Sequence, residues 1–117
     1  MNWEQQYRRL VKLSRELSPY PDSAKDDEHL VSGCEAKVWL YVDNSDPDAV
    51  VIRFDSGSRI IKGLLALIQQ RLDGKPQQAI RQFNIDALFR EEGLEGHLTP
   101  SRTNGLTQVA RELSRRA

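Results

Sequence analysis

Apolar side chains recur every three or four positions at the start of the chain, with basic residues mostly off that face. This spacing predicts an amphipathic helix over residues 2–17. Asn2 is a suitable N-cap, because its side-chain oxygen can accept a backbone N–H at the helix start. Pro19 and Pro21 end the helix, since proline lacks the N–H that would continue it.

The middle of the chain follows a strand pattern. Residues 37–43 and 49–55 are rich in β-branched and aromatic side chains, and turn-forming residues separate them. These two segments predict an antiparallel hairpin. We interpret residues 29–32 as a third, shorter strand, which places Cys34 at the tip of a hairpin loop. The polar segment 22–28 fits a loop or one helical turn.

Helical patterns return in the second half of the chain. The most hydrophobic helix begins after Ser58, its N-cap, and stops at Gly74, and we expect it to be the core element. Two shorter helices are predicted over residues 76–83 and 86–92. The last helix begins at Pro100, with Thr99 as its N-cap. It gathers arginines near its C-terminus, where the helix dipole favours positive charge.

The order of elements, with a helix first, then strands, then helices, predicts an α+β fold. We expect a small antiparallel sheet of about three strands, covered by helices on one face. The chain has 117 residues, which is near the usual domain size, and it contains no internal repeat or linker. The sequence therefore predicts a single domain over residues 1–117.

Composition narrows the class of protein. Hydrophobic residues make up 38% of the chain and charged residues 29%, as in a soluble globular domain. The 17 basic and 17 acidic residues cancel, which argues against nucleic acid as the main partner. No apolar run approaches the roughly 20 residues of a spanning helix, and the start lacks a signal-peptide pattern. With one cysteine, these features predict a cytoplasmic protein without a membrane partner.

Cys34 is the one cysteine of the chain. A lone thiol forms no internal disulfide and supplies too few soft ligands for a closed zinc or iron–sulfur site. The two histidines lie far apart in sequence and no phosphate-binding glycine loop is present, so we expect no metal and no organic cofactor. Two interpretations of Cys34 remain: a small buried hydrophobe, or a reactive thiol that Gly33 helps to display on a loop.

Three separated stretches, in the same order, resemble the SufE family of sulfur-acceptor proteins, which includes the CsdE proteins. Residues 31–39 (VSGCEAKVW) resemble the family's cysteine loop and following strand. Residues 55–64 (DSGSRIIKGL) resemble its strand-to-helix junction, and residues 97–106 (HLTPSRTNGL) its C-terminal signature. Gly57 departs from the aspartate that members often place there.

The resemblance implies a role in sulfur relay. In the family, a pyridoxal-phosphate cysteine desulfurase forms a persulfide on itself, and the SufE-type protein accepts that sulfur on its own cysteine. The sulfur then passes to an iron–sulfur scaffold or another acceptor. By its position in the motif, Cys34 is the acceptor. The protein would thus be a carrier and activator of the desulfurase, not an independent enzyme, with the pyridoxal phosphate held by the partner.

Other residues are candidates for the thiol environment or for partner contacts. Gly33 would act as a hinge, while Glu35 and Lys37 flank the thiol directly. Four more residues are candidates that also have a purely structural interpretation. Trp39 would then be a core residue, and Asp55 a cap or turn at the strand exit. Arg102 would form a salt bridge or a helix-end contact, and His97 would be a capping or packing group.

Two competing functions use the same residues. Cys34 and His97 would serve a cysteine hydrolase or transferase, with the histidine as base. No glycine-rich oxyanion segment or orienting acid is evident at a recognisable spacing, which argues against this hypothesis. The other alternative is a non-catalytic adaptor whose cysteine is incidental.

Overall fold

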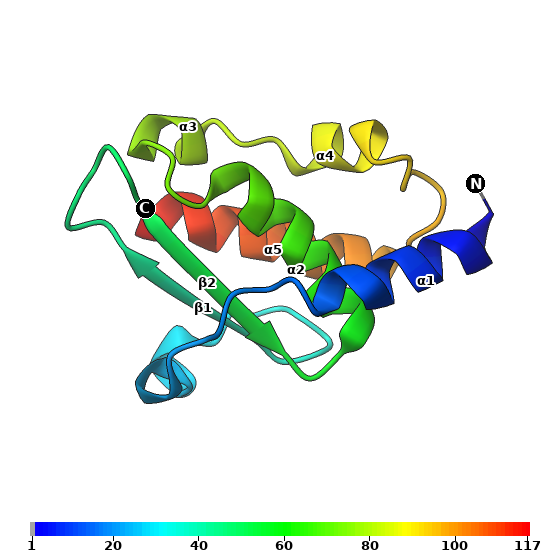
Figure 1. Ribbon diagram of the computed structural model, residues 1–117, viewed down its shortest axis with the longest axis horizontal. Coiled ribbons are helices and arrows are strands. Elements are labelled where there is room, and N and C mark those ends of the chain that lie inside the picture. Colours follow the sequence, from blue (N-terminus) through cyan, green and yellow to red (C-terminus); the bar gives the residue numbers. More distant parts are fainter. Residues whose placement is uncertain (1) are drawn as a thin grey trace.

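The protein has an α+β architecture of helices packed on a β-hairpin (Figure 1). The computed structural model describes residues 2–117, so Met1 of the expected 1–117 domain lies outside the described residues. In chain order the elements are α1 (Trp3–Ser14), the 3-10 turns η1 (Asp22–Ala24) and η2 (Asp27–His29), β1 (Val38–Asp43), β2 (Val51–Ser56), α2 (Arg59–Leu72), α3 (Gln77–Arg81), α4 (Ile85–Glu91) and α5 (Pro100–Arg116).

Helix α1 begins as the sequence predicts and ends earlier. The Asn2 side chain accepts a hydrogen bond from the Gln5 amide, and the Gln5 side chain accepts one from the Asn2 amide, which forms a capping box. The helix ends at Ser14, not at residue 17. There the Ser14 hydroxyl donates to the Val11 carbonyl at 2.6 Å, and the next amides turn back to form tighter turns.

The two long helices that follow the sheet start at the predicted caps. The Ser58 hydroxyl accepts the Ile61 amide at 3.3 Å, and the Thr99 hydroxyl accepts the Arg102 amide at 3.4 Å. Helix α2 is buried along most of its length and forms the centre of the core, as its apolar sequence predicts. Helix α5 lies beside it and contributes Leu106, Val109 and Leu113 to the same core.

The sheet is a two-stranded antiparallel hairpin. Strands β1 and β2 pair from Val38 opposite Ser56 to Asp43 opposite Val51. Alternate side chains are buried on the inner face: Val38, Leu40, Ile52 and Phe54. Helices α2 and α5 cover this face (Figure 1), so the predicted arrangement of helices on one face of a small sheet is confirmed.

The prediction of about three strands is wrong, because residues 29–32 do not form a strand. A single bridge joins Leu30 to Trp39. The 3-10 turn η2 directs the His29 amide to Asp26 and the Leu30 amide to Asp27. The His29 amide, which would pair with β1 in a regular ladder, is therefore unavailable, and only the short segment around the bridge approaches β1.

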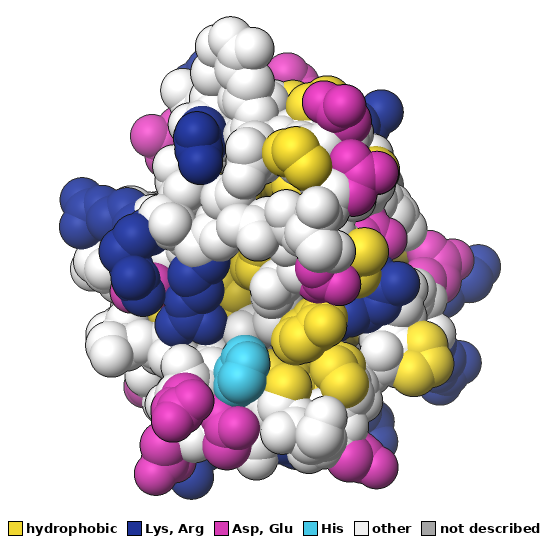
Figure 2. All heavy atoms as spheres, turned by 90° about the vertical axis from the view of Figure 1, so that its left-hand side faces the viewer, with side chains coloured by type: hydrophobic (Ala, Val, Ile, Leu, Met, Phe, Trp, Pro, Cys, Tyr) yellow, Lys and Arg dark blue, Asp and Glu magenta, His cyan; other side chains and the backbone are white. Residues whose placement is uncertain are grey.

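Charged side chains of both signs cover the surface, with local clusters of each. Lysine and arginine side chains gather on one flank of the face in Figure 2. Acidic side chains gather at the bottom of that view, where Figure 1 places segment 22–28. The acidic residues of this segment are all exposed: Asp22, Asp26, Asp27 and Glu28.

Candidate functional site

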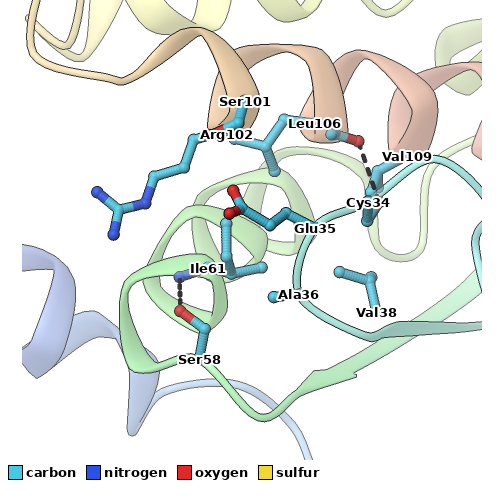
Figure 3. Close-up of a pocket in the computed structure, with 11 residues that line it drawn as sticks. Cys34, Glu35, Ala36, Val38, Ser58, Ile61, Ser101, Arg102, Leu106 and Val109 are labelled. Carbon is cyan, nitrogen blue, oxygen red and sulfur yellow. Dashed lines mark hydrogen bonds between the residues drawn. The ribbon is translucent and has the colours of Figure 1, made fainter.

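A cavity of about 210 Å³ lies beside Cys34, between the cysteine loop, the start of α2 and the first turns of α5 (Figure 3). Elements that are distant in sequence therefore meet at the one thiol of the chain. The residues that line the cavity are Cys34, Glu35, Ala36, Val38, Ser58, Ile61, Ser101, Arg102, Gly105, Leu106 and Val109.

The loop begins at a buried valine and turns sharply at a glycine two residues later. Val31 is buried, and its amide donates to the Val38 carbonyl at 2.9 Å, which closes the loop at its base. Gly33 adopts φ +87°, a left-handed conformation that side chains disfavour. A Cβ at Gly33 would also lie 3.1 Å from Cγ of Gln108 on α5. The glycine thus lets the chain turn against α5 and direct Cys34 toward the cavity.

The thiol of Cys34 is half-buried and hydrogen-bonded. Its Sγ donates to the Gly105 carbonyl at 3.4 Å (Figure 3). Burial raises the pKa of the Cys34 thiol above its ordinary value. This conformation therefore holds a neutral, sheltered thiol, whereas the nucleophile in sulfur chemistry is the thiolate.

Gly105 is a site residue that the sequence reasoning missed. It lies inside α5, and a Cβ there would lie 3.7 Å from both Cα and Sγ of Cys34. At that distance a methyl group would make an ordinary van der Waals contact, so the loop lies directly against α5, and the Gly105 carbonyl accepts the hydrogen bond from the thiol. The available signal was a glycine within a helical pattern, which often marks a close approach of another chain segment.

Of the four predicted charged residues, Glu35 and Arg102 lie at the cavity, whereas Lys37 and Asp55 do not. Glu35 is exposed and Arg102 half-buried, and both line the cavity. The Arg102 guanidinium points away from Cys34 (Figure 3). Lys37 is exposed and is not among the lining residues.

Trp39 and Asp55 lie opposite each other on the outer face of the hairpin, away from the cavity. The Lys25 ammonium lies 4.9 Å from the Trp39 ring centroid and 2.8 Å from the Asp55 carboxylate. Lys62 approaches the other oxygen of that carboxylate at 3.7 Å. These contacts tie segment 22–28 to the sheet, so neither residue is placed to act on Cys34 directly.

His97 is not brought to the thiol. Its ring stacks on Trp3, with centroids 6.3 Å apart and an interplanar angle of 19°. Among the described residues, no histidine lines the cavity around Cys34, so the geometry does not form the base–thiol pair that a cysteine hydrolase requires.

Residues 2–117 contain neither a membrane-spanning helix nor a cluster of metal-binding side chains. No helix in this range is long and apolar enough to span a membrane. Within the same range, no three or more His, Cys, Asp or Glu side chains come together in a group able to hold a metal ion.

The fold and the site define an α+β domain that holds one loop cysteine beside a cavity. Its sequence matches the SufE family, described as an Fe–S metabolism associated domain, over residues 1–117. The chain belongs to this family, and the resemblance found in its motifs is confirmed.

Comparisons with individual proteins agree. The chain is 30% identical over 116 residues to the cysteine desulfuration protein SufE of Wigglesworthia glossinidia brevipalpis, covering 99% of this chain and 81% of that protein. Its fold is similar to the solution structure of a hypothetical protein from Thermus thermophilus, with a TM-score of 0.78 and 20% identity. That match covers 98% of this chain and 83% of the other, and it shows the fold.

Proposed function

We propose that this protein accepts sulfur from a cysteine desulfurase on Cys34 and relays it toward iron–sulfur cluster assembly. The observation that carries the proposal is the placement of the one thiol of the chain on a loop beside a cavity. Family membership supports the desulfurase as partner, and the position of Cys34 in the family's cysteine motif supports it as the acceptor.

The reaction is an exchange between sulfur atoms. The Cys34 thiolate attacks the outer sulfur of the desulfurase persulfide, and a new S–S bond forms on Cys34. The S–S bond of the donor breaks, and the donor cysteine leaves as a thiolate that takes up a proton. No net oxidation or reduction occurs: a thiol and a persulfide become a persulfide and a thiol.

A single cysteine suits a carrier. A second thiol nearby would attack the persulfide and convert it into a disulfide, releasing the sulfur. The cavity offers space for the additional sulfur atom, and part of its lining is apolar: Ala36, Val38, Ile61, Leu106 and Val109. Such a lining limits access by water and small polar reductants.

Sulfur transfer also requires presentation of the thiol. In the described conformation Cys34 is directed to Gly105, and burial holds it in the neutral form by raising the pKa of the thiol. A donor persulfide must approach within bonding distance, so the loop must carry Cys34 out of this position. The turn at Gly33 and the exposed residues Ser32 and Lys37 lie between buried Val31 and Val38, and this segment is able to move while the two valines stay in the core.

The rest of the relay follows from the same chemistry. The loaded protein transfers its outer sulfur to an iron–sulfur scaffold or another sulfur acceptor. It needs no resident metal or organic cofactor, because the pyridoxal phosphate belongs to the desulfurase. We place the reaction in the cytoplasm, where a lone thiol stays reduced.

Incubation with a cysteine desulfurase and free cysteine, followed by intact-mass measurement, tests the proposal. The wild-type protein should gain the mass of one sulfur atom, and peptide mapping should place it on Cys34. The Cys34→Ser variant keeps a donor for the Gly105 carbonyl and should fold normally, yet gain no sulfur and give no stimulation of the desulfurase.

Two results would contradict the proposal. Sulfur bound covalently to the serine variant would remove Cys34 as the acceptor. Equal stimulation of the desulfurase by both proteins, without any gain of mass in the wild type, would instead identify a non-catalytic adaptor.

A further inference from the structure

The loop that carries Cys34 is closed by little backbone pairing. The segments that enter and leave it, here called its two stems, meet at the bridge between Leu30 and Trp39. The hydrogen bond from the Val31 amide to the Val38 carbonyl, at 2.9 Å, belongs to this bridge. Backbone held by so few contacts opens easily, so the position of the whole loop depends on what else binds the stems.

Arg116, in the last turn of α5, binds both stems. Its Nη1 donates to the carbonyl oxygens of Leu40 at 3.1 Å and His29 at 3.5 Å, and its Nη2 donates to that of Leu30 at 3.3 Å. Its Nε donates to Glu112 Oε2 at 3.1 Å, which orients the guanidinium. Only 18% of the Arg116 side chain is exposed.

One of these hydrogen bonds replaces a missing strand contact. In the register of the isolated bridge, His29 lies opposite Leu40, and a regular antiparallel strand would donate the His29 amide to the Leu40 carbonyl. That amide is instead directed to the Asp26 side chain at 3.1 Å. Arg116 supplies the donor to Leu40 in its place.

We propose that Arg116 is a positioning residue for the acceptor thiol. By holding both stems against α5, it confines loop movement to residues 32–37, so that Cys34 returns to the cavity after each excursion. We call the hydrogen bonds from Arg116 to the two stems the clamp. Its role in sulfur transfer rests on the proposed function of Cys34, but the clamp is present in the free protein.

The guanidinium is suited to this task. Its five N–H donors in a rigid fork reach several carbonyls at once, and its charge does not titrate in the physiological range. A lysine ammonium at this position keeps the charge but lacks the planar fork. Glutamine removes the charge and leaves at most two donors. Either change leaves stem carbonyls unbound and lets the loop open from its base.

Alkylation of Cys34 by iodoacetamide tests the clamp without a desulfurase. At fixed pH, Arg116→Gln should react roughly tenfold faster than the wild type, the effect of losing about one charge-assisted hydrogen bond on an opening equilibrium. Arg116→Lys should show a smaller increase, and it carries the test if the glutamine variant does not fold. Intact mass follows the reaction.

Urea separates local opening from general destabilisation. Opening of the loop exposes little surface, so the alkylation rate should change only weakly with urea below the unfolding transition. Alkylation through global unfolding would rise steeply over the same range. The matched control is Arg115→Gln, because Arg115 donates to the same Glu112 carboxylate, at 2.9 and 2.7 Å, yet is 69% exposed.

The inference is overturned by any of three results. These are unchanged alkylation in both Arg116 variants, an equal rise in the Arg115 control, or a steep dependence on urea. Failure of the wild-type protein to accept sulfur would contradict the proposed function alone, since alkylation of the free thiol does not involve transfer. The two hypotheses can therefore fail separately.

Discussion

At the scale of single residues, the environment of Cys34 favours protection over reactivity. Burial raises the pKa of its thiol, and the hydrogen bond to the Gly105 carbonyl requires the protonated form. Attack on a persulfide requires the thiolate. The sheltered thiol is thus a poor nucleophile. The desulfurase must therefore expose the loop before Cys34 can react.

The raised pKa predicts a dependence of stability on pH. Folding favours the protonated thiol, so the contribution of Cys34 is fully present below the unfolded-state pKa of about 8.5 and is lost as pH rises through the higher folded-state pKa. We expect the wild type to lose unfolding free energy relative to Cys34→Ser as pH rises above the unfolded-state pKa. Urea unfolding of both proteins measures the difference, in which the other titrating groups cancel. Parallel curves would contradict it.

The sequence predicts some of the residues around the thiol and not others. Glu35 lies at the cavity because it follows Cys34 in the chain, and the family motif associates Arg102 with the same region. Ile61 and Gly105 come from separate helices whose packing depends on the whole core. A glycine within the helical pattern of α5 signals a close approach, but no local pattern indicates that the approaching segment is the distant cysteine loop.

At the scale of elements, helices α1 and α2 cross at Gly63. A Cβ at this position would lie 2.2 Å from the Leu10 carbonyl oxygen and 2.7 Å from its carbonyl carbon. These are backbone atoms of a helix, so neither can move aside as the end of a side chain would. The close approach lets α1 cover α2 and bury Leu10 completely.

Gly63→Ala should therefore destabilise the protein, by about 2 kcal/mol or more, although alanine is the better helix former. Gly57→Ala is the matched control, because a Cβ there meets no atom within 4 Å. It should leave the unfolding free energy unchanged or slightly raised. Thermal and urea unfolding of both variants measure these effects. Equal stability of the two variants would show that α1 shifts without penalty.

The sequence predicts the helix starts correctly because their signals are local. It does not predict the conformation of residues 29–32, which depends on distant contacts. Ser58 and Thr99 mark helix starts through hydrogen bonds to residues three positions on, so the sequence alone suffices. Residues 29–32 have a plausible strand sequence. Their conformation is decided by the Asp26 side chain and by Arg116, which arrives from the other end of the chain.

At the scale of the whole molecule, a carboxylate joins three helices. Glu92, just after α4, accepts hydrogen bonds from Arg9 of α1 and Arg71 of α2, the latter at 2.9 Å. The backbone adds to this junction: Arg9 donates to the Glu92 carbonyl at 3.1 Å, and Gln6 donates to the Gly93 carbonyl at 2.9 Å. The N-terminal helix is thereby fixed to the connection that leads toward α5.

The charge of Glu92 makes this junction sensitive to acid. Burial opposes its ionisation, but the hydrogen bonds from Arg71 and Arg9 outweigh that effect and lower its pKa. Its contribution to stability is present above the unfolded-state pKa of about 4.3 and is lost as pH falls through the lower folded-state value. The junction should therefore hold at neutral pH and weaken in acid.

Glu92→Gln should lower the unfolding free energy by about 1–2 kcal/mol at neutral pH, because glutamine is neutral and cannot accept two charge-assisted hydrogen bonds equally well. The difference from the wild type should shrink as pH falls below about 4, where the wild-type carboxylate is protonated as well. Glu91→Gln is the control. Among residues 2–117, Glu91 pairs with Arg71 alone and is 58% exposed, so its loss should change stability by less than about 0.5 kcal/mol. Urea unfolding of the three proteins at neutral and acidic pH measures this. Equal effects of the two substitutions, or a difference independent of pH, would show that shape and not charge holds α1 in place.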